Sequence, residues 1–582
     1  MAAAPAGAPT PLKRFLRMLR PDSRDIGYLY LYAVLVGILA LVGPLGVQAI
    51  INLIAGGSFN FSLVILVAVV TGATIMVGTL KIFQYVVAET LQRRVFARAA
   101  LEFAYRLPRI KLEALRQHYP PELVNRFFDT VTVQKGLPKI LMDISGAVMQ
   151  IVFGLILVAL YHPFFAAFGL ILAILLFLLL RVAAPRGLQT SLVESKYKYK
   201  VAGWLEDIAR ASNTFKLAGG ERLSMRKTNT LLGGYLDSRR DHFRVLLFHY
   251  GGLVLFQALV TASFLLLGGN LVIENQINIG QFVAAEIIII SIASNAEKLV
   301  FALDVVYDTL TGVEKIASVT DLPLEESGHL TWESVDTGQG MEVELKNVTF
   351  TYQESGMVAL DDINLHLQPN HLYCIAGYNR SGRSTLIRIL AGMRFDFEGR
   401  LTFNRVPVGN LELDGLRRNI GDYSPEENII PDNLINNICL GHPDVNFERI
   451  KWALKLAQLD DWISEQALGY ETELVAEGLN VPRSVRVRLL LARAIIRKPR
   501  LLALGSLLEQ LEPGIRRKIM EGLRSQDACP WTVVVVSNDP TVAMACDHAI
   551  VMRRGQIIAQ GTPTEMLNDP TTDEVWITPK LD

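Results

Sequence analysis

Residues 377–385 read GYNRSGRST, which is the spacing of a phosphate-binding loop. In such a loop, Gly377 and Gly382 let backbone N–H groups and the N-terminus of a helix point at phosphate oxygens. Ser384 offers a hydroxyl group to Mg²⁺, and Arg383 stands where the loop normally has a lysine. The guanidinium group keeps the positive charge of lysine but not its compact shape. We therefore expect phosphate chemistry here, with weak or absent binding of ATP and Mg²⁺.

Two elements must hold this loop, and the flanking sequence predicts both. The segment LYCIAG before it is typical of a buried strand, and STLIRILAG after it is typical of a helix. Two further strand-like runs, VELKNVTFTY and TVVVVS, indicate an α/β domain over residues 341–582. An acidic stretch precedes this domain and marks residues 318–340 as a linker.

The N-terminal half of the chain has a different character. Hydrophobic residues make up 51% of the sequence and the mean hydropathy is +0.30, which is typical of a protein partly embedded in a membrane. Apolar stretches long enough to cross a bilayer as helices, which takes about 20 residues each, follow one another along this half. They cover residues 27–54, 61–87, 139–161, 164–183, 247–272 and 279–303. We predict a six-helix transmembrane domain over residues 26–317.

Basic residues predict the orientation of these helices. The short loops near 55–60, 161–163 and 273–278 carry no lysine or arginine, whereas the two long loops are rich in both. Both long loops and both termini are therefore expected in the cytosol. Residues 1–25 are then a short cytosolic arm, because no small-residue cleavage site follows their basic region. The formal net charge of zero gives no sign of a nucleic-acid partner.

One carboxylate, Glu286, lies inside the apolar run QFVAAEIIIISIAS. A carboxylate is costly in lipid and usually faces a protein interior or a water-filled cavity, so Glu286 is a candidate for a substrate path. A position near the outer interface, from which the side chain reaches water, explains the residue equally well. The cysteines have no metal-binding or redox spacing, and we expect buried, reduced thiols at Cys374, Cys439, Cys529 and Cys546.

With these features together, the chain resembles the ABC transporter superfamily, in the domain order of exporter half-transporters. The segments LVGPLGVQAIINLI and GWLEDIARASNTFKLAGG are similar to those of bacterial type I secretion exporters. The resemblance implies the bacterial inner membrane, a dimer with a second copy or another ABC half, and a periplasmic adaptor protein. It also implies membrane helices that extend into the cytosol and turn through short crossing helices, for which residues 121–128 and 212–222 are the candidates.

The resemblance assigns roles to further residues. Tyr352 matches the aromatic residue that stacks on adenine, although a core strand tyrosine would look the same. Glu426 falls where the family has a glutamine that senses the γ-phosphate. The nucleotide-binding set is then Tyr352, Gly377, Asn379, Ser381, Gly382, Arg383, Ser384, Thr385 and Glu426, with Ser384 as the Mg²⁺ ligand.

The family's catalytic positions do not carry their usual residues. Gly505 replaces an aspartate that holds Mg²⁺, Ser506 replaces a glutamate that acts as general base, and Asn538 replaces a histidine that supports the attacked phosphate. No nearby carboxylate obviously substitutes, since Glu509 lies a turn beyond the base position. The family signature LSGGQ, which contacts ATP on the opposite subunit, corresponds to Val481, Pro482, Arg483, Ser484 and Val485. We predict a degenerate nucleotide-binding domain without useful ATPase activity of its own.

Three functions are compatible with these observations. The first is a non-hydrolysing subunit of an exporter of a peptide, protein or lipid-like cargo, with ATP turnover supplied by a partner ABC half. The second is a homodimeric scaffold or nucleotide-sensing regulator without transport turnover. The third is an ATPase that uses an unrecognised base.

Overall fold

The computed structural model describes residues 9–55, 61–116, 120–353, 355–423, 428–525 and 529–576. The chain divides into two compact units, Met1–Leu324 and Glu325–Asp582, and the division falls within the predicted linker. Each unit has its own buried core. The N-terminal core is made by helices, and the C-terminal core is built around a β-sheet.

The N-terminal unit is helical throughout its described residues. Its long helices are α2 (Ser23–Ala40), α3 (Val42–Ala55), α4 (Phe61–Arg106), α8 (Ser145–Ala159), α9 (Pro163–Arg210), α11 (Glu221–Ile273) and α12 (Ile279–Thr320). Shorter helices are α1 (Pro11–Leu19), α5 (Leu112–Arg116), α6 (Pro120–Asn125), α7 (Asp129–Pro138) and α10 (Ser212–Leu217). Single 3₁₀ turns lie at Arg20–Asp22, Leu107–Arg109 and Arg126–Phe128.

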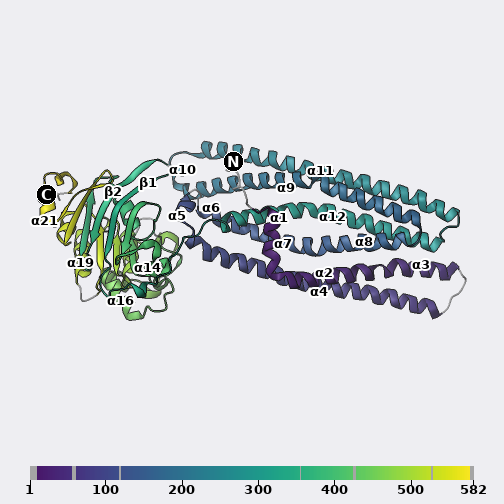
Figure 1. Ribbon diagram of the computed structural model, residues 1–582, viewed down its shortest axis with the longest axis horizontal. Helices are drawn as coiled ribbons and strands as arrows, with labels where there is room; N and C mark the ends of the chain where they lie inside the picture. Colours follow the sequence, from purple (N-terminus) through teal and green to yellow (C-terminus); the bar gives the residue numbers. More distant parts are fainter. Residues whose placement is uncertain are drawn as a thin grey trace. The chain divides into compact units, whose positions relative to one another are not determined.

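Within the described residues, 6 helical segments are long and apolar enough to cross a membrane, which confirms the predicted number. Helices α2 and α3 together form the first. Helix α9 has 48 residues and α11 has 53, far more than the about 20 that a bilayer needs. Figure 1 shows α9 alongside α11 and α2 alongside α4. The predicted crossing segments are helical, as α6 with its following 3₁₀ turn and as α10, and their docking stays a prediction.

A change of helix type precedes α8. Pro138 closes α7 and has no N–H group to donate, and Lys139–Ile144 then form a π-helical segment, η4. Such segments interrupt the regular hydrogen-bond ladder and are frequent at functional sites. Here the segment brings Lys139 and Asp143 to the wall of a cavity, which is described below.

The C-terminal unit contains a six-stranded sheet in the order β12-β11-β3-β10-β9-β6. Its strands are β3 (Leu372–Gly377), β6 (Ile420–Tyr423), β9 (Leu501–Leu504), β10 (Thr532–Val536), β11 (His548–Arg553) and β12 (Gln556–Gly561). All neighbouring strands are parallel except β12, which pairs antiparallel with β11. Every residue of β3, β9 and β10 is buried, as expected for parallel strands covered on both faces.

A smaller antiparallel sheet has the order β2-β1-β4-β5. Its strands are β1 (Val343–Tyr352), β2 (Met357–Leu367), β4 (Glu398–Phe403) and β5 (Val406–Pro407), and β7 (Asp432–Asn433) pairs separately with β8 (Glu473–Leu474). The helices of this unit are α13 (Arg383–Leu390), α14 (Leu413–Arg418), α15 (Leu434–Cys439), α16 (Phe447–Leu456), α17 (Asp460–Ser464), α18 (Arg483–Ile495), α19 (Pro513–Arg524), α20 (Pro540–Met544) and α21 (Pro563–Asn568).

The predicted strands at LYCIAG, VELKNVTFTY and TVVVVS are confirmed as β3, β1 and β10, and the helix after the loop is confirmed as α13. The fold class is therefore as predicted, a six-helix transmembrane domain followed by an α/β domain. All four cysteines are buried and free, as expected.

Gly421 in β6 generates a test of the packing in the C-terminal unit. A Cβ atom there would lie 2.4 Å from the carbonyl oxygen of Ala494 and 2.9 Å from Cδ1 of Leu502. Because the carbonyl group belongs to the backbone, Gly421→Ala should destabilise this unit by about 1–3 kcal/mol. Thermal unfolding of the full chain, followed by tryptophan fluorescence, measures the effect.

Gly409 provides the matched control, because nothing lies within 4 Å of a Cβ atom at that position. Gly409→Ala should change stability by less than about 0.5 kcal/mol. Equal unfolding temperatures for the two variants would contradict the packing described here.

Candidate functional site

The phosphate-binding loop connects β3 to α13, as the sequence predicts. Gly382 is the N-cap residue of α13 and has a φ of +98°, which favours glycine. A Cβ atom at this position would also lie 2.4 Å from the carbonyl oxygen of Ala359. The loop therefore keeps the backbone shape that directs N–H groups towards an anion.

The side chains of the loop depart from a simple phosphate cradle. Arg380 has a φ of +65°, a backbone region that is costly for a residue with a side chain. Ser381 is buried, and its hydroxyl oxygen has no hydrogen-bond partner within the described structure. Asn379 and Ser384 are exposed and thus accessible to a ligand.

Asn538 forms the main contact across this site. Its side-chain amide accepts a hydrogen bond from the Gly377 N–H (3.0 Å) and donates one to the Gly377 carbonyl oxygen (3.1 Å). The same amide oxygen accepts a hydrogen bond from Nη1 of Arg383 at 2.6 Å. Asn538 thus joins the end of β10 to both the start and the basic residue of the loop, a contact that sequence reasoning missed.

Glu509 lies close to these groups, although no role was predicted for it. One of its carboxylate oxygens accepts the backbone N–H of Asn538 at 3.1 Å. Burial lowers the pKa of Arg383, and the negative charge of Glu509 acts in the opposite direction. The positive charge of the loop is therefore already partly compensated by the protein.

Tyr352, the candidate for adenine stacking, has contacts on its ring and on its hydroxyl group. Its hydroxyl is 3.0 Å from Oγ1 of Thr385, which links β1 to α13. The guanidinium carbon of the buried Arg394 lies 5.2 Å from the centre of the Tyr352 ring and 4.4 Å from that of Phe350. These contacts fix the ring in the domain, and its stacking role stays a prediction.

The residues beside the loop fit Mg²⁺ less well than they fit a phosphate group. Gly505 and Ser506 follow β9 and offer no carboxylate, which leaves Ser384 as the candidate ligand. In the described ranges, no group of at least three His, Cys, Asp or Glu side chains is arranged to hold a metal ion. Glu426, the candidate γ-phosphate sensor, lies outside the described residues.

The segment of residues 481–485, predicted to correspond to the family signature, packs into its own domain. Val481 and Val485 are buried in the core around α18, and Pro482 caps that helix. Arg483 donates from Nε to Gln510 Oε1 at 3.1 Å. Ser484 is half-buried, at the start of α18. Positions 481 and 485 carry apolar side chains, and the segment contains neither glycine of the family signature.

The N-terminal unit contains a polar cavity of about 500 Å³ that the sequence did not predict. Residues of α2, α4, η4, α8 and α12 line it, among them Lys81, Lys139, Asp143, Glu297 and Lys298. All five lie within or at the edge of the predicted apolar stretches. Unlike Glu286, they do not lie inside a long uninterrupted apolar run, so the apolar pattern did not single them out. Glu286 is half-buried and does not line this cavity, so its role in a substrate path stays a prediction.

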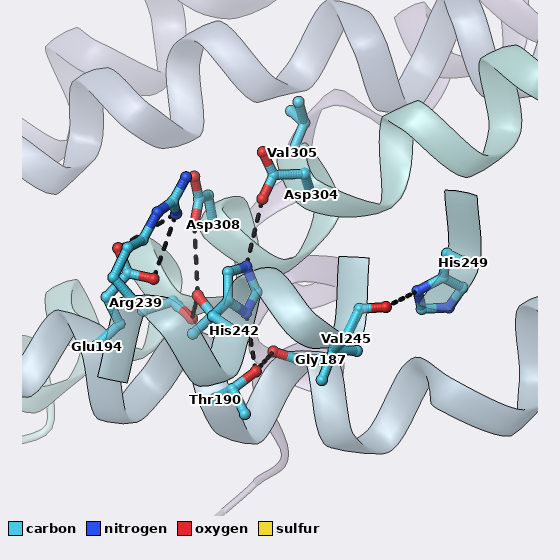
Figure 2. Close-up of polar contacts among 12 residues, drawn as sticks. Gly187, Thr190, Glu194, Arg239, His242, Val245, His249, Asp304, Val305 and Asp308 are labelled. Carbon is cyan, nitrogen blue, oxygen red and sulfur yellow. Dashed lines mark hydrogen bonds and ion pairs between the residues drawn. The ribbon is translucent and has the colours of Figure 1, made fainter. Parts of the chain in front are cut away.

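A polar cluster around the buried His242 joins three long helices, as Figure 2 shows. The fully buried His242 of α11 is 2.8 Å from Thr190 Oγ1 on α9 and 3.3 Å from Asp304 Oδ1 on α12. Arg239 pairs with Glu194 at 3.3 Å between α11 and α9. These polar contacts cross-link α9, α11 and α12 where they continue past the predicted spans.

Comparisons with known proteins agree with this architecture. The family model of the ABC transporter transmembrane region matches residues 26–293, and the ABC transporter model matches residues 360–505. The alpha-hemolysin translocation ATP-binding protein HlyB of Proteus vulgaris is 27% identical over 321 residues, which are 55% of this chain and 45% of that protein. The uncharacterized ABC transporter ATP-binding protein YfiB of Bacillus subtilis is 30% identical over 228 residues, 39% of each protein. The similarity thus spans less than half the length of these curated relatives.

A solved structure, that of a bacterial Atm1-family ABC exporter with ATP bound, has the same fold with a TM-score of 0.84. It covers 96% of this chain and 98% of that one at 17% sequence identity. The two family models match one unit each and together more than half of the chain. The chain therefore belongs to the ABC transporter family, as a half-transporter of the exporter type that joins the transmembrane region and the ABC domain in one polypeptide.

Proposed function

We propose that this chain is a non-hydrolysing subunit of an ABC exporter in a bacterial inner membrane, and that a partner ABC half supplies ATP turnover. One observation carries the proposal: β9 ends at Leu504 and continues into Gly505 and Ser506, without a carboxylate. Phosphoryl transfer is catalysed by positioning and by charge stabilisation around Mg²⁺. Without a metal carboxylate and a general base beside the loop, the chain lacks both contributions.

The remaining charges beside the loop support the same proposal. The Arg383 guanidinium donates from Nη1 to Asn538 at 2.6 Å, so one of its five N–H groups is already engaged by the protein. The Glu509 carboxylate accepts the Asn538 N–H, so it serves the structure of the loop. This bond occupies one carboxylate oxygen and holds Glu509 against the backbone of Asn538, a turn beyond the position of the family's base.

The chain retains groups that can hold a nucleotide. The loop backbone around Gly382 and the exposed Ser384 hydroxyl suit the phosphates. When bound between two ABC domains, ATP supplies the binding free energy that draws the domains together. We propose that nucleotide binding here is weak, because Thr385 and Arg383 already have partners in the protein.

The type I secretion resemblance supports a peptide, protein or lipid-like cargo and a periplasmic adaptor. HlyB is named as a translocation protein for alpha-hemolysin, and we extend only the class of activity to this chain. The second candidate function is a homodimeric scaffold or nucleotide-sensing regulator. The two hydrogen bonds between the Asn538 side chain and the backbone of Gly377 favour this second function, because they stabilise the loop conformation without a nucleotide.

The first test concerns turnover. The purified full chain alone should hydrolyse ATP at the background rate, and a co-purified ABC partner should raise the rate by at least about a thousandfold. Restoring both carboxylates, with Gly505→Asp and Ser506→Glu, should not recover hydrolysis in the chain alone, because the signature of each copy stays degenerate. Recovery of turnover would contradict a defect on both sides of the composite site. Turnover by the unaltered chain would refute the proposal itself.

The second test concerns Mg²⁺. Because Gly505 offers no metal ligand, the affinity of the chain for ATP should differ by less than about threefold between Mg²⁺ and excess EDTA. The variant Gly505→Asp should gain a preference for Mg²⁺·ATP of about tenfold, while Gly409→Asp, on the surface of the same unit, should not. Equilibrium titration with a fluorescent ATP analogue provides the affinities. A strong Mg²⁺ preference in the unaltered chain would mean that another carboxylate reaches the metal ion.

A further inference from the structure

The lysines of the polar cavity lie at one depth along three different helices. Lys81 follows the start of α4 at Phe61, Lys298 follows the start of α12 at Ile279, and Lys139 precedes the end of α8 at Ala159. Each separation is about 20 residues, which corresponds to roughly 30 Å along a helix. Since the helix ends border the short loops, this distance equals the hydrocarbon thickness of a bilayer, about 30 Å. The lysines therefore lie at the inner boundary of the predicted membrane region.

Lysines at a membrane boundary often extend towards lipid headgroups, and that explanation must be weighed first. Here all three face the same cavity, whose wall also contains the buried amides of Gln84 and Asn295. Asn295 donates to Gln150 Oε1 at 2.8 Å, and its own oxygen is 3.4 Å from Lys298 Nζ. Buried amides in the wall favour a polar binding site over lysines that only extend towards lipid headgroups, because headgroup contacts do not require polar groups inside the helix bundle.

The carboxylates of the cavity do not neutralise these lysines. Within the described residues, no ion pair joins Lys81, Lys139 or Lys298 to a carboxylate of the cavity. Glu297 accepts a hydrogen bond from Gln257 of α11 at 3.2 Å. Asp143 lies one turn from Lys139 and can offset one ammonium group. Three ammonium groups against two carboxylates leave the lining of the cavity with an excess of positive charge, on side chains that are exposed.

We propose that this cavity binds an anionic group, a phosphate or a carboxylate, through Lys81, Lys139 and Lys298. Hydrogen bonds between ammonium groups and an anion are charge-assisted, and they are stronger than those between neutral groups. The anionic group belongs either to a lipid headgroup at the inner membrane boundary or to a soluble molecule that enters from the cytosol. The anion can be part of the cargo only if the proposed export function is correct. Anion binding by the cavity does not depend on that function.

The test uses the full chain in nanodiscs and needs neither ATP nor a partner. In the first arm, nanodiscs contain equal amounts of phosphatidylglycerol and phosphatidylcholine, and native mass spectrometry counts the lipids retained by the protein. In the second arm, nanodiscs contain phosphatidylcholine only, and inorganic phosphate is titrated while thermal unfolding is followed. The main variant carries Lys81→Gln, Lys139→Gln and Lys298→Gln, and a second variant carries arginine at the same positions.

A matched control carries Lys13→Gln, Lys196→Gln and Lys216→Gln, three exposed lysines of the same unit outside the cavity. We expect the cavity glutamine variant to lose about tenfold in affinity per lysine that contacts the anion, while the arginine variant and the control retain binding. Loss of phosphatidylglycerol retention supports a lipid headgroup, and loss of stabilisation by phosphate supports a soluble anion. If the unaltered chain and the glutamine variant behave alike in both arms, the proposal is overturned. Single lysine variants repeat the comparison if the triple variant does not fold.

Since both arms measure binding without turnover, a failure here leaves the proposed export function standing. A failure of that function, such as ATP turnover by the chain alone, would likewise leave anion binding by the cavity intact.

Discussion

In both units of this chain, the positions of charged side chains are constrained by the free energy that is lost when a charge leaves water. In the ABC domain, the guanidinium group of Arg383 is largely withdrawn from water, and it is held by Asn538 with the Glu509 carboxylate nearby. In the transmembrane domain, three lysines from different helical segments line one cavity beside buried amides. In both places the protein brings polar groups to the charge, so the position of a charged side chain indicates where water or a ligand is admitted.

The fold of the ABC domain does not depend on the residues that phosphoryl transfer requires. Its stability comes from strands such as β3, β9 and β10, which are buried along their whole length, and from the apolar faces that cover them. Gly505 and Asn538 lie beyond the ends of these strands. Replacing carboxylates by neutral residues there removes charges that the free protein would otherwise have to solvate. The scaffold can therefore persist after the catalytic groups have changed.

Much of this structure could be predicted from the sequence, because its signals are local. A loop with two glycines between a buried strand and a helix gave the position of Gly382, and uninterrupted apolar runs gave the spanning helices. The contact between Asn538 and Arg383 could not be predicted, since it joins residues 155 positions apart through the pairing of β10 with β3. The cavity was missed for a related reason. Lys81, Lys139 and Lys298 are isolated in sequence, and only the packing of three helices brings them together.

The proposed function places changes in both the phosphate loop and the signature of one chain, and this affects how the subunit can contribute to transport. The family pairs each phosphate loop with the signature of the opposite subunit, so under the proposed function this chain weakens one composite site through its loop and the other through its signature. Val481 and Val485 are core residues of this chain. Substitutions that restored the signature at these positions would therefore disturb that core. Under the proposed function, energy from ATP enters through the partner's loop, at a site with a poor signature. This chain would then influence the cycle through the difference in its nucleotide affinity between separated and closed domains, because a ligand shifts a conformational equilibrium only by that difference.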